Sequence, residues 1–204
     1  MRKLLIVAAL FLASLPSLGY TTPTVGDVIV SQPSNVPSFR FTVLTANGYV
    51  SFSVSKDWRV ITMQSKPPVA VAGFQLVNQA DKHTSDATNV VISLIQPGTE
   101  EGERALIKIG KSYEGSVTAS SRLGWDLYSQ KAHQKETEYA VLDAKKSIAD
   151  VIVAVRVAWP HLSKNSPQYD SGMQEIFDNL LKSIDGNLGV YTTQPGDVLR
   201  RPEK

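Results

Sequence analysis

Alternating apolar and polar residues on both sides of Asn47-Gly48 constrain the fold of this chain more than any other feature. Apolar side chains occupy every second position from Phe39 to Val43, and again from Val50 to Val54. This period of two is typical of β-strands with one buried face, and Asn-Gly favours a hairpin turn because both residues can adopt positive φ. The segment therefore predicts an antiparallel hairpin whose alternate serines face solvent.

Further strands follow along the chain, with two helices between and after them. Thr99 precedes three glutamates and a helical apolar pattern, which predicts a capped helix. Residues Met173 to Ile184 form an amphipathic stripe, with Gly186 at the position of a C-terminal cap. The other predicted strands are 58–63, 69–77, 90–95, 116–122, 124–129, 137–144 and 150–159. The last is apolar on both faces and is expected at the centre of a sheet. The fold class predicted is α+β, a curved antiparallel sheet with helices packed on it.

The first nineteen residues have the pattern of a secretory signal peptide. Arg2 and Lys3 precede an apolar run from Leu4 to Ala13, which is too short to span a bilayer. The alternative is a buried N-terminal helix. The expected organisation is a signal peptide at 1–19, an N-terminal leader at 20–38 that could contain a short strand at 28–30, one α+β domain at 39–186 and a flexible tail at 187–204. We therefore expect a periplasmic or secreted protein without a stable membrane anchor.

Composition excludes several classes of function. The chain has no cysteine, so disulfides, thiolate nucleophiles and zinc-thiolate sites are absent. It carries 21 Lys and Arg against 19 Asp and Glu, and the predicted signal contains two of the basic residues. The mature protein is then formally neutral and has no basic run, which argues against nucleic acid as a partner.

Catalytic and metal-binding motifs are also missing from the sequence. His83, His133 and His161 show none of the usual metal-ligand spacings, so solvated loop histidines are the favoured interpretation. No GxSxG or phosphate-binding loop is present. We therefore expect no enzyme, no cofactor and no metal, although a hydrolase with a dispersed site stays open.

The most distinctive segment runs from Trp159 through His161 to Tyr169. These residues could rim a pocket or present an interaction surface, because aromatic side chains are enriched at binding hot spots. The favoured structural interpretation is that Trp159 plugs the end of the sheet. The candidate binding residues are Trp159, His161, Tyr169, Trp125 and Trp58.

The order of these segments resembles the Mog1/PsbP-like group of exported bacterial domains. The resembling stretches are 50–54 with 56–58, 124–128, 138–141 and the helix at 173–184, within residues 39–185. The resemblance implies an α/β/α sandwich around an antiparallel sheet. It also implies a non-enzymatic role as an adaptor, assembly factor or binding module.

Three functions are compatible with these observations. The first is a periplasmic protein-binding module, such as an immunity protein against a secreted toxin or an envelope assembly factor, whose partner is another protein. The second is a periplasmic carrier that binds a small amphipathic ligand between sheet and helix. The third is the hydrolase with a dispersed site.

Overall fold

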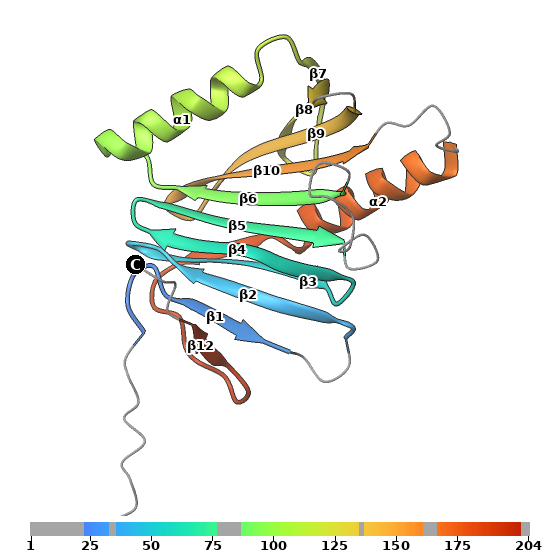
Figure 1. Cartoon of the computed structure of the whole chain (residues 1–204). Coiled ribbons are helices and arrows are strands. Elements are labelled where there is room, and N and C mark those ends of the chain that lie inside the picture. Colours follow the sequence, from blue (N-terminus) through green and yellow to red (C-terminus); the bar gives the residue numbers. More distant parts are fainter. Residues whose placement is uncertain (1–22, 33–35, 77–86, 135–136, 161–166, 201–204) are drawn as a thin grey trace, which may run out of the picture.

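A computed structural model of the chain describes residues 23–32, 36–76, 87–134, 137–160 and 167–200. Within these residues it forms two antiparallel sheets and two helices (Figure 1). The five-stranded sheet contains, from edge to edge, β11 (Asp185–Leu188), β3 (Gly48–Ser55), β2 (Ser38–Leu44), β1 (Val28–Ser31) and β12 (Val198–Arg200). The seven-stranded sheet contains β4 (Trp58–Lys66), β5 (Val69–Leu76), β6 (Asn89–Ile95), β10 (Val151–Pro160), β9 (Thr137–Ile148), β8 (Trp125–Gln134) and β7 (Val117–Arg122).

The two helices lie on opposite faces of the seven-stranded sheet (Figure 1). Helix α2 (Pro167–Ser183) and the five-stranded sheet pack on the inner face, where Phe177 of α2, Phe52 of β3 and Val153 of β10 belong to one core. Helix α1 (Glu100–Ser112) lies over the outer face. Burial of the apolar strand faces in this single core is the main stabilising term.

The predicted fold class, an α+β sheet with helices in a Mog1/PsbP-like α/β/α sandwich, is wrong. The structure is mostly β, and a second antiparallel sheet covers much of the inner face where a helical layer was expected. Strands β1, β11 and β12 join the β2–β3 hairpin to make this second sheet. These strands have only three or four residues each, too few for periodicity to reveal a sheet.

The predicted hairpin is confirmed, but its turn has a different cause. Strands β2 and β3 pair antiparallel with Phe41 opposite Phe52. Neither Asn47 nor Gly48 adopts positive φ. A Cβ at Gly48 would lie 2.1 Å from the backbone oxygen of Asn187, so glycine is needed there because β11 approaches closely.

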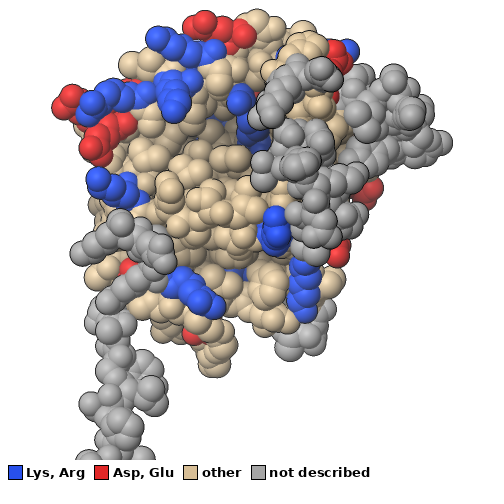
Figure 2. Space-filling model, viewed as in Figure 1, with Lys and Arg blue, Asp and Glu red and all other residues tan. Residues whose placement is uncertain are grey.

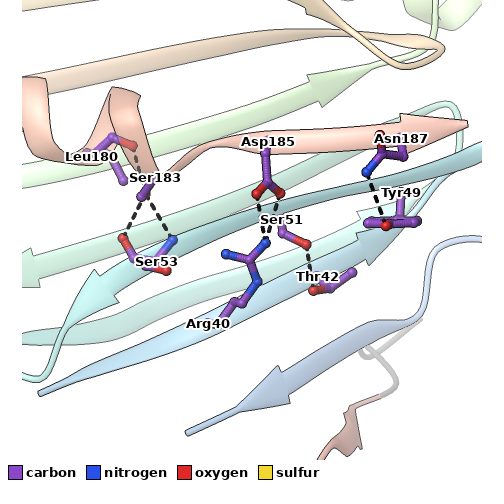
Figure 3. Close-up of polar contacts among 9 residues, drawn as sticks. All are labelled: Arg40, Thr42, Tyr49, Ser51, Ser53, Leu180, Ser183, Asp185 and Asn187. Carbon is purple, nitrogen blue, oxygen red and sulfur yellow. Dashed lines mark hydrogen bonds and ion pairs between the residues drawn. The ribbon is translucent and has the colours of Figure 1, made fainter. Parts of the chain in front are cut away.

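Segments interpreted as leader and tail contribute to the five-stranded sheet. Val28 in β1 is fully buried and pairs with Val43. Figure 3 shows how the chain after α2 attaches to β2 and β3. Arg40 Nη2 donates to Asp185 Oδ1 at 2.8 Å, and the hydroxyl of Ser183 accepts from the backbone N–H of Ser53 at 3.0 Å. These contacts align β11 beside β3.

Most other predicted elements are confirmed. Thr99 caps α1 by accepting a hydrogen bond from the N–H of Gly102 at 3.1 Å. Strand β10 is the central strand of its sheet, as its apolar composition predicted. The predicted role of Gly186 as a helix cap is wrong, because this residue pairs with Val50 within β11.

Candidate functional site

The outer face of the seven-stranded sheet is mainly uncharged and is hollowed beneath α1. Because side chains alternate along a strand, cross-strand partners form rows on this face. One row contains Val71, Ser93 and Ala154, and the next contains Gly73, Val91, Arg156 and Asp143. Figure 2 shows this face as a broad uncharged area with both basic (blue) and acidic (red) side chains around its border.

Helix α1 covers this face without packing tightly on it. Its only fully buried residue is Gly102, where a Cβ would lie 2.0 Å from the backbone oxygen of Gln96. The N-terminal end of α1 is thus held close to the end of β6. Farther along, Ala105 and Ile109 face the sheet and are only half-buried. The helix therefore stands away from the sheet and leaves space beneath it.

A pocket of about 420 Å³ occupies this space. Its apolar lining consists of Val69, Val71, Val91, Ile95, Ala105, Ile109, Ala154 and Val155, and its polar lining of Ser93, Lys108, Ser112, Tyr113, Asp143 and Arg156. Ligand sites of about 300–1,000 Å³ with apolar walls and a few polar groups are typical of small-molecule binding proteins. The pocket has the size and lining of such a site.

The polar groups of the pocket gather near the C-terminal end of α1. Arg156 Nε donates to Asp143 Oδ1 at 2.7 Å, and its Nη2 donates to Asp143 Oδ2 at 3.0 Å. The same Nη2 donates to the hydroxyl of Ser112 at 3.1 Å. Gln130 Nε2 donates to Asp143 Oδ2 at 3.1 Å and to the Ser112 carbonyl at 3.0 Å. This network connects β8, β9 and β10 to the end of α1.

Burial and the Asp143 carboxylate together determine the protonation states of Arg156 and Tyr113 in this network. Burial disfavours the charged guanidinium of Arg156, but its hydrogen bond and attraction to Asp143 outweigh this and raise its pKa. Burial, followed by the Asp143 carboxylate, raises the pKa of Tyr113 well above its ordinary value. Tyr113 also stacks on Tyr128 with ring centroids 4.5 Å apart. Arg156 is therefore a cation and Tyr113 a neutral hydroxyl at physiological pH.

The structure places the three predicted tryptophans away from this pocket. Trp58, Trp125 and Trp159 are all buried in the core between the sheets and α2. Trp159 Nε1 donates to Asp170 Oδ1 at 2.9 Å, which attaches the end of β10 to α2. Tyr169 lies in the first turns of α2, and His161 lies outside the described residues. The three tryptophans are brought together as core residues.

Sequence reasoning did not identify the residues of the pocket. Arg156 is the only charged residue between Val151 and Pro160, in an otherwise apolar strand. A single charge in a central strand is a usable signal, because buried charges need partners and often mark sites. Its partner Asp143 was not recognisable, since the pairing depends on the β9–β10 register.

Metal binding by histidine and carboxylate side chains has no support in the described part of the chain. His133 is exposed, and its Nε2 lies 3.7 Å from Glu138 Oε2. His83 lies outside the described residues. Among those that are described, no group of three or more His, Asp or Glu side chains could hold a metal ion. Neither helix of the described ranges has the length and apolar character needed to cross a membrane.

Comparisons with known proteins identify no family. Neither a family model nor a curated protein matches the chain. One similar solved structure, from Bacteroides thetaiotaomicron, has a TM-score of 0.40 and 13% identity over 68% of this chain and 45% of that one. Another is LpqN, a protein involved in cell envelope biogenesis of Mycobacterium tuberculosis, with a TM-score of 0.41 and 10% identity. That alignment covers 78% of this chain and 91% of LpqN. The chain thus spans less than half of the Bacteroides protein, and likeness at this level assigns no function. The Mog1/PsbP-like resemblance stays a prediction.

Proposed function

We propose that this chain is an exported, non-catalytic binding protein that carries a small amphipathic molecule in the pocket under α1. The observation that carries the proposal is the 420 Å³ pocket between α1 and the outer face of the sheet. Apolar floor and roof residues favour a hydrocarbon body, and the polar cluster at one end favours a polar head. The signal-like pattern of residues 1–19 supports a location outside the cytoplasm.

Filling the pocket should abolish binding while preserving the fold. Ser93 is half-buried on the pocket floor, so Ser93→Phe would occupy the space beneath α1. We expect the affinity for the fluorescent probe 1-anilinonaphthalene-8-sulfonate to fall by about tenfold or more, because the ligand volume is lost. Titration of the probe into the purified protein measures this change.

The matched control is Ser147→Phe. Ser147 is exposed on β9 and does not line the pocket, so this variant adds the same side chain elsewhere. Its probe affinity should equal that of the unmodified chain. A folded Ser93→Phe protein that binds the probe as tightly as the control would contradict the proposed carrier function.

A second candidate function is binding of a protein partner, including the roles of immunity protein or assembly factor. It is favoured by β4, an edge strand on which Val60 and Ile61 are each 46% exposed. Apolar edge strands are suited to pairing with an extended strand of another protein. The partner would supply an extended strand that pairs with β4.

Site-specific photo-crosslinking tests this second function. A benzoylphenylalanine at position 61 should give one discrete adduct with a protein of the envelope, and the purified partner should reproduce it. The control position is Ile107, which is 59% exposed and lies on helix α1 rather than on a strand. Equal crosslinking from both positions, or none from position 61, counts against a partner at β4.

A further inference from the structure

We infer that the ligand of the pocket under α1 is an amphipathic monoanion, a hydrocarbon chain ending in a carboxylate, and that Arg156 binds its head. This inference rests on the proposed function, because it names the ligand class of the same pocket. It is carried by the charges, the hydrogen-bond geometry and the apolar lining of that pocket.

The charges that line the pocket do not cancel. Lys108 and Arg156 are cationic, and Asp143 is the only carboxylate among the lining residues. The ion pair between Arg156 and Asp143 leaves Lys108 as the excess charge. One net positive charge beside apolar walls is complementary to one negative charge on a ligand, and the apolar surroundings strengthen their attraction.

Arg156 retains hydrogen-bonding capacity for such a head. Its Nε and Nη2 are used by Asp143 and Ser112, whereas Nη1 has no hydrogen-bond partner within the part of the chain that the structure describes. The side chain is 38% exposed, and its ion pair with Asp143 holds it in place. Asp143 itself is 1% exposed, so it serves to fix the guanidinium rather than to meet a ligand. A fixed, charged donor is well suited to a carboxylate.

Nearby negative groups are already partnered. The carbonyl of Ser112, at the negative end of α1, accepts a hydrogen bond from Gln130. Both oxygens of Asp143 accept from Arg156, and Oδ2 also accepts from Gln130. Tyr113, whose raised pKa keeps its hydroxyl neutral, also lines the pocket and adds no negative charge to it.

The pocket also sets the direction of the ligand. Arg156 and Asp143 lie near Ser112 at the C-terminal end of α1, through the contacts given above. Val69 and Ile95 lie opposite each other two rows away, near the end of β6 that leads into α1. The head therefore lies under the C-terminal end of α1, and the hydrocarbon chain points toward its N-terminal end.

Calorimetric titration of three probes with one common chain tests this inference. Decanoate, decanol and decyltrimethylammonium share a hydrocarbon tail and differ only in the charge of the head. We expect decanoate to bind about tenfold more tightly than decanol, since charge-assisted hydrogen bonds are roughly twice as strong as neutral ones. The cationic probe should bind weakest. In parallel, the Nε–Hε resonance of Arg156 in ¹⁵N-labelled protein should shift with decanoate and not with decanol.

Two variants assign the preference to Arg156. The double variant Arg156→Gln with Asp143→Asn removes the fixed guanidinium and its partner but leaves Lys108 in place, so the preference for decanoate should shrink to the smaller part that Lys108 supplies. Arg104→Gln removes an exposed charge on α1 from a residue that does not line the pocket. This variant should keep the preference for decanoate. Equal affinity of decanoate and decanol, or no shift of the Arg156 resonance, overturns the inference while leaving the carrier function supported. Binding of none of the probes overturns both, and a preference that is undiminished in the double variant overturns the assignment to Arg156.

Discussion

Replacing Arg156 with methionine should lower the free energy of unfolding by about 3 kcal/mol, because it leaves a buried carboxylate without its cation. Asp143 is 1% exposed and receives two hydrogen bonds from Arg156. Removal of one partner from a buried ion pair costs about 3–5 kcal/mol in general. We expect the lower end of that range, since Gln130 still donates to Asp143 and Arg156 is partly exposed. Urea denaturation followed by circular dichroism measures the change.

Two comparisons make this result specific to a buried charge. Arg122→Met removes a surface ion pair with Asp178 and should cost less than about 1 kcal/mol, because exposed pairs contribute little. Combining Arg156→Met with Asp143→Leu should restore much of the lost stability, since no unpaired charge then remains. A cost for Arg156→Met no larger than that of Arg122→Met would show that Asp143 is not buried as described.

The same ion pair illustrates what the sequence could and could not predict. Period-two patterns located β2 and β3, and the apolar run from Val151 located the central strand β10, because burial of a strand face leaves a direct trace in composition. Arg156 is the one charged residue of that run, but sequence reasoning did not single it out, and its partner was not recognisable. Asp143 is opposite Arg156 only through the register of two long strands, which is a tertiary property.

The second sheet was missed for a related reason. A short strand was expected at 28–30, where the structure has β1, but its place in a sheet was not expected because the surrounding segment is rich in proline and serine. Gly48 and Gly186 were assigned to a turn and a helix cap, the usual local roles of glycine. In the structure both glycines lie where β3 and β11 approach closely. A Cβ at Gly186 would be 2.6 Å from the backbone oxygen of Tyr49. Local rules cannot anticipate contacts between segments more than 100 residues apart.

Aromatic residues were named as binding candidates without information on burial, although a structural plug was the favoured interpretation of Trp159. Trp and Tyr are enriched both in protein cores and at interfaces, so residue type alone does not separate these roles. The site supported by the structure instead uses aliphatic residues of β5, β6 and β10. In the sequence these residues have the pattern of ordinary core positions. They line a pocket because α1 does not pack tightly against them.

Replacing Phe74 with alanine should destabilise the protein by about 4 kcal/mol, the largest effect that we expect from a single truncation. Phe74 is fully buried on β5, and its ring meets Phe41 and Phe52 of the other sheet edge-on, at centroid distances of 5.4 and 6.0 Å. The variant removes this contact between the sheets and leaves a cavity that neighbouring strands cannot easily fill. Phe39→Ala, at a partly buried position beside the same core, should cost about 1–2 kcal/mol and is the matched control.

A double-mutant cycle on Phe41 and Phe74 tests the two-sheet arrangement itself. Phe41 lies on β2 and Phe74 on β5, so their rings meet only if the five-stranded sheet packs against the seven-stranded sheet. Edge-to-face pairs are worth about 0.5–1.5 kcal/mol beyond their burial, and we expect a coupling energy in that range between Phe41→Leu and Phe74→Leu. Phe39 and Phe74 should show a smaller coupling. Additive effects of the Phe41 and Phe74 substitutions would mean that the two sheets do not face each other through these rings, and the pocket on the outer face would then lose its structural support.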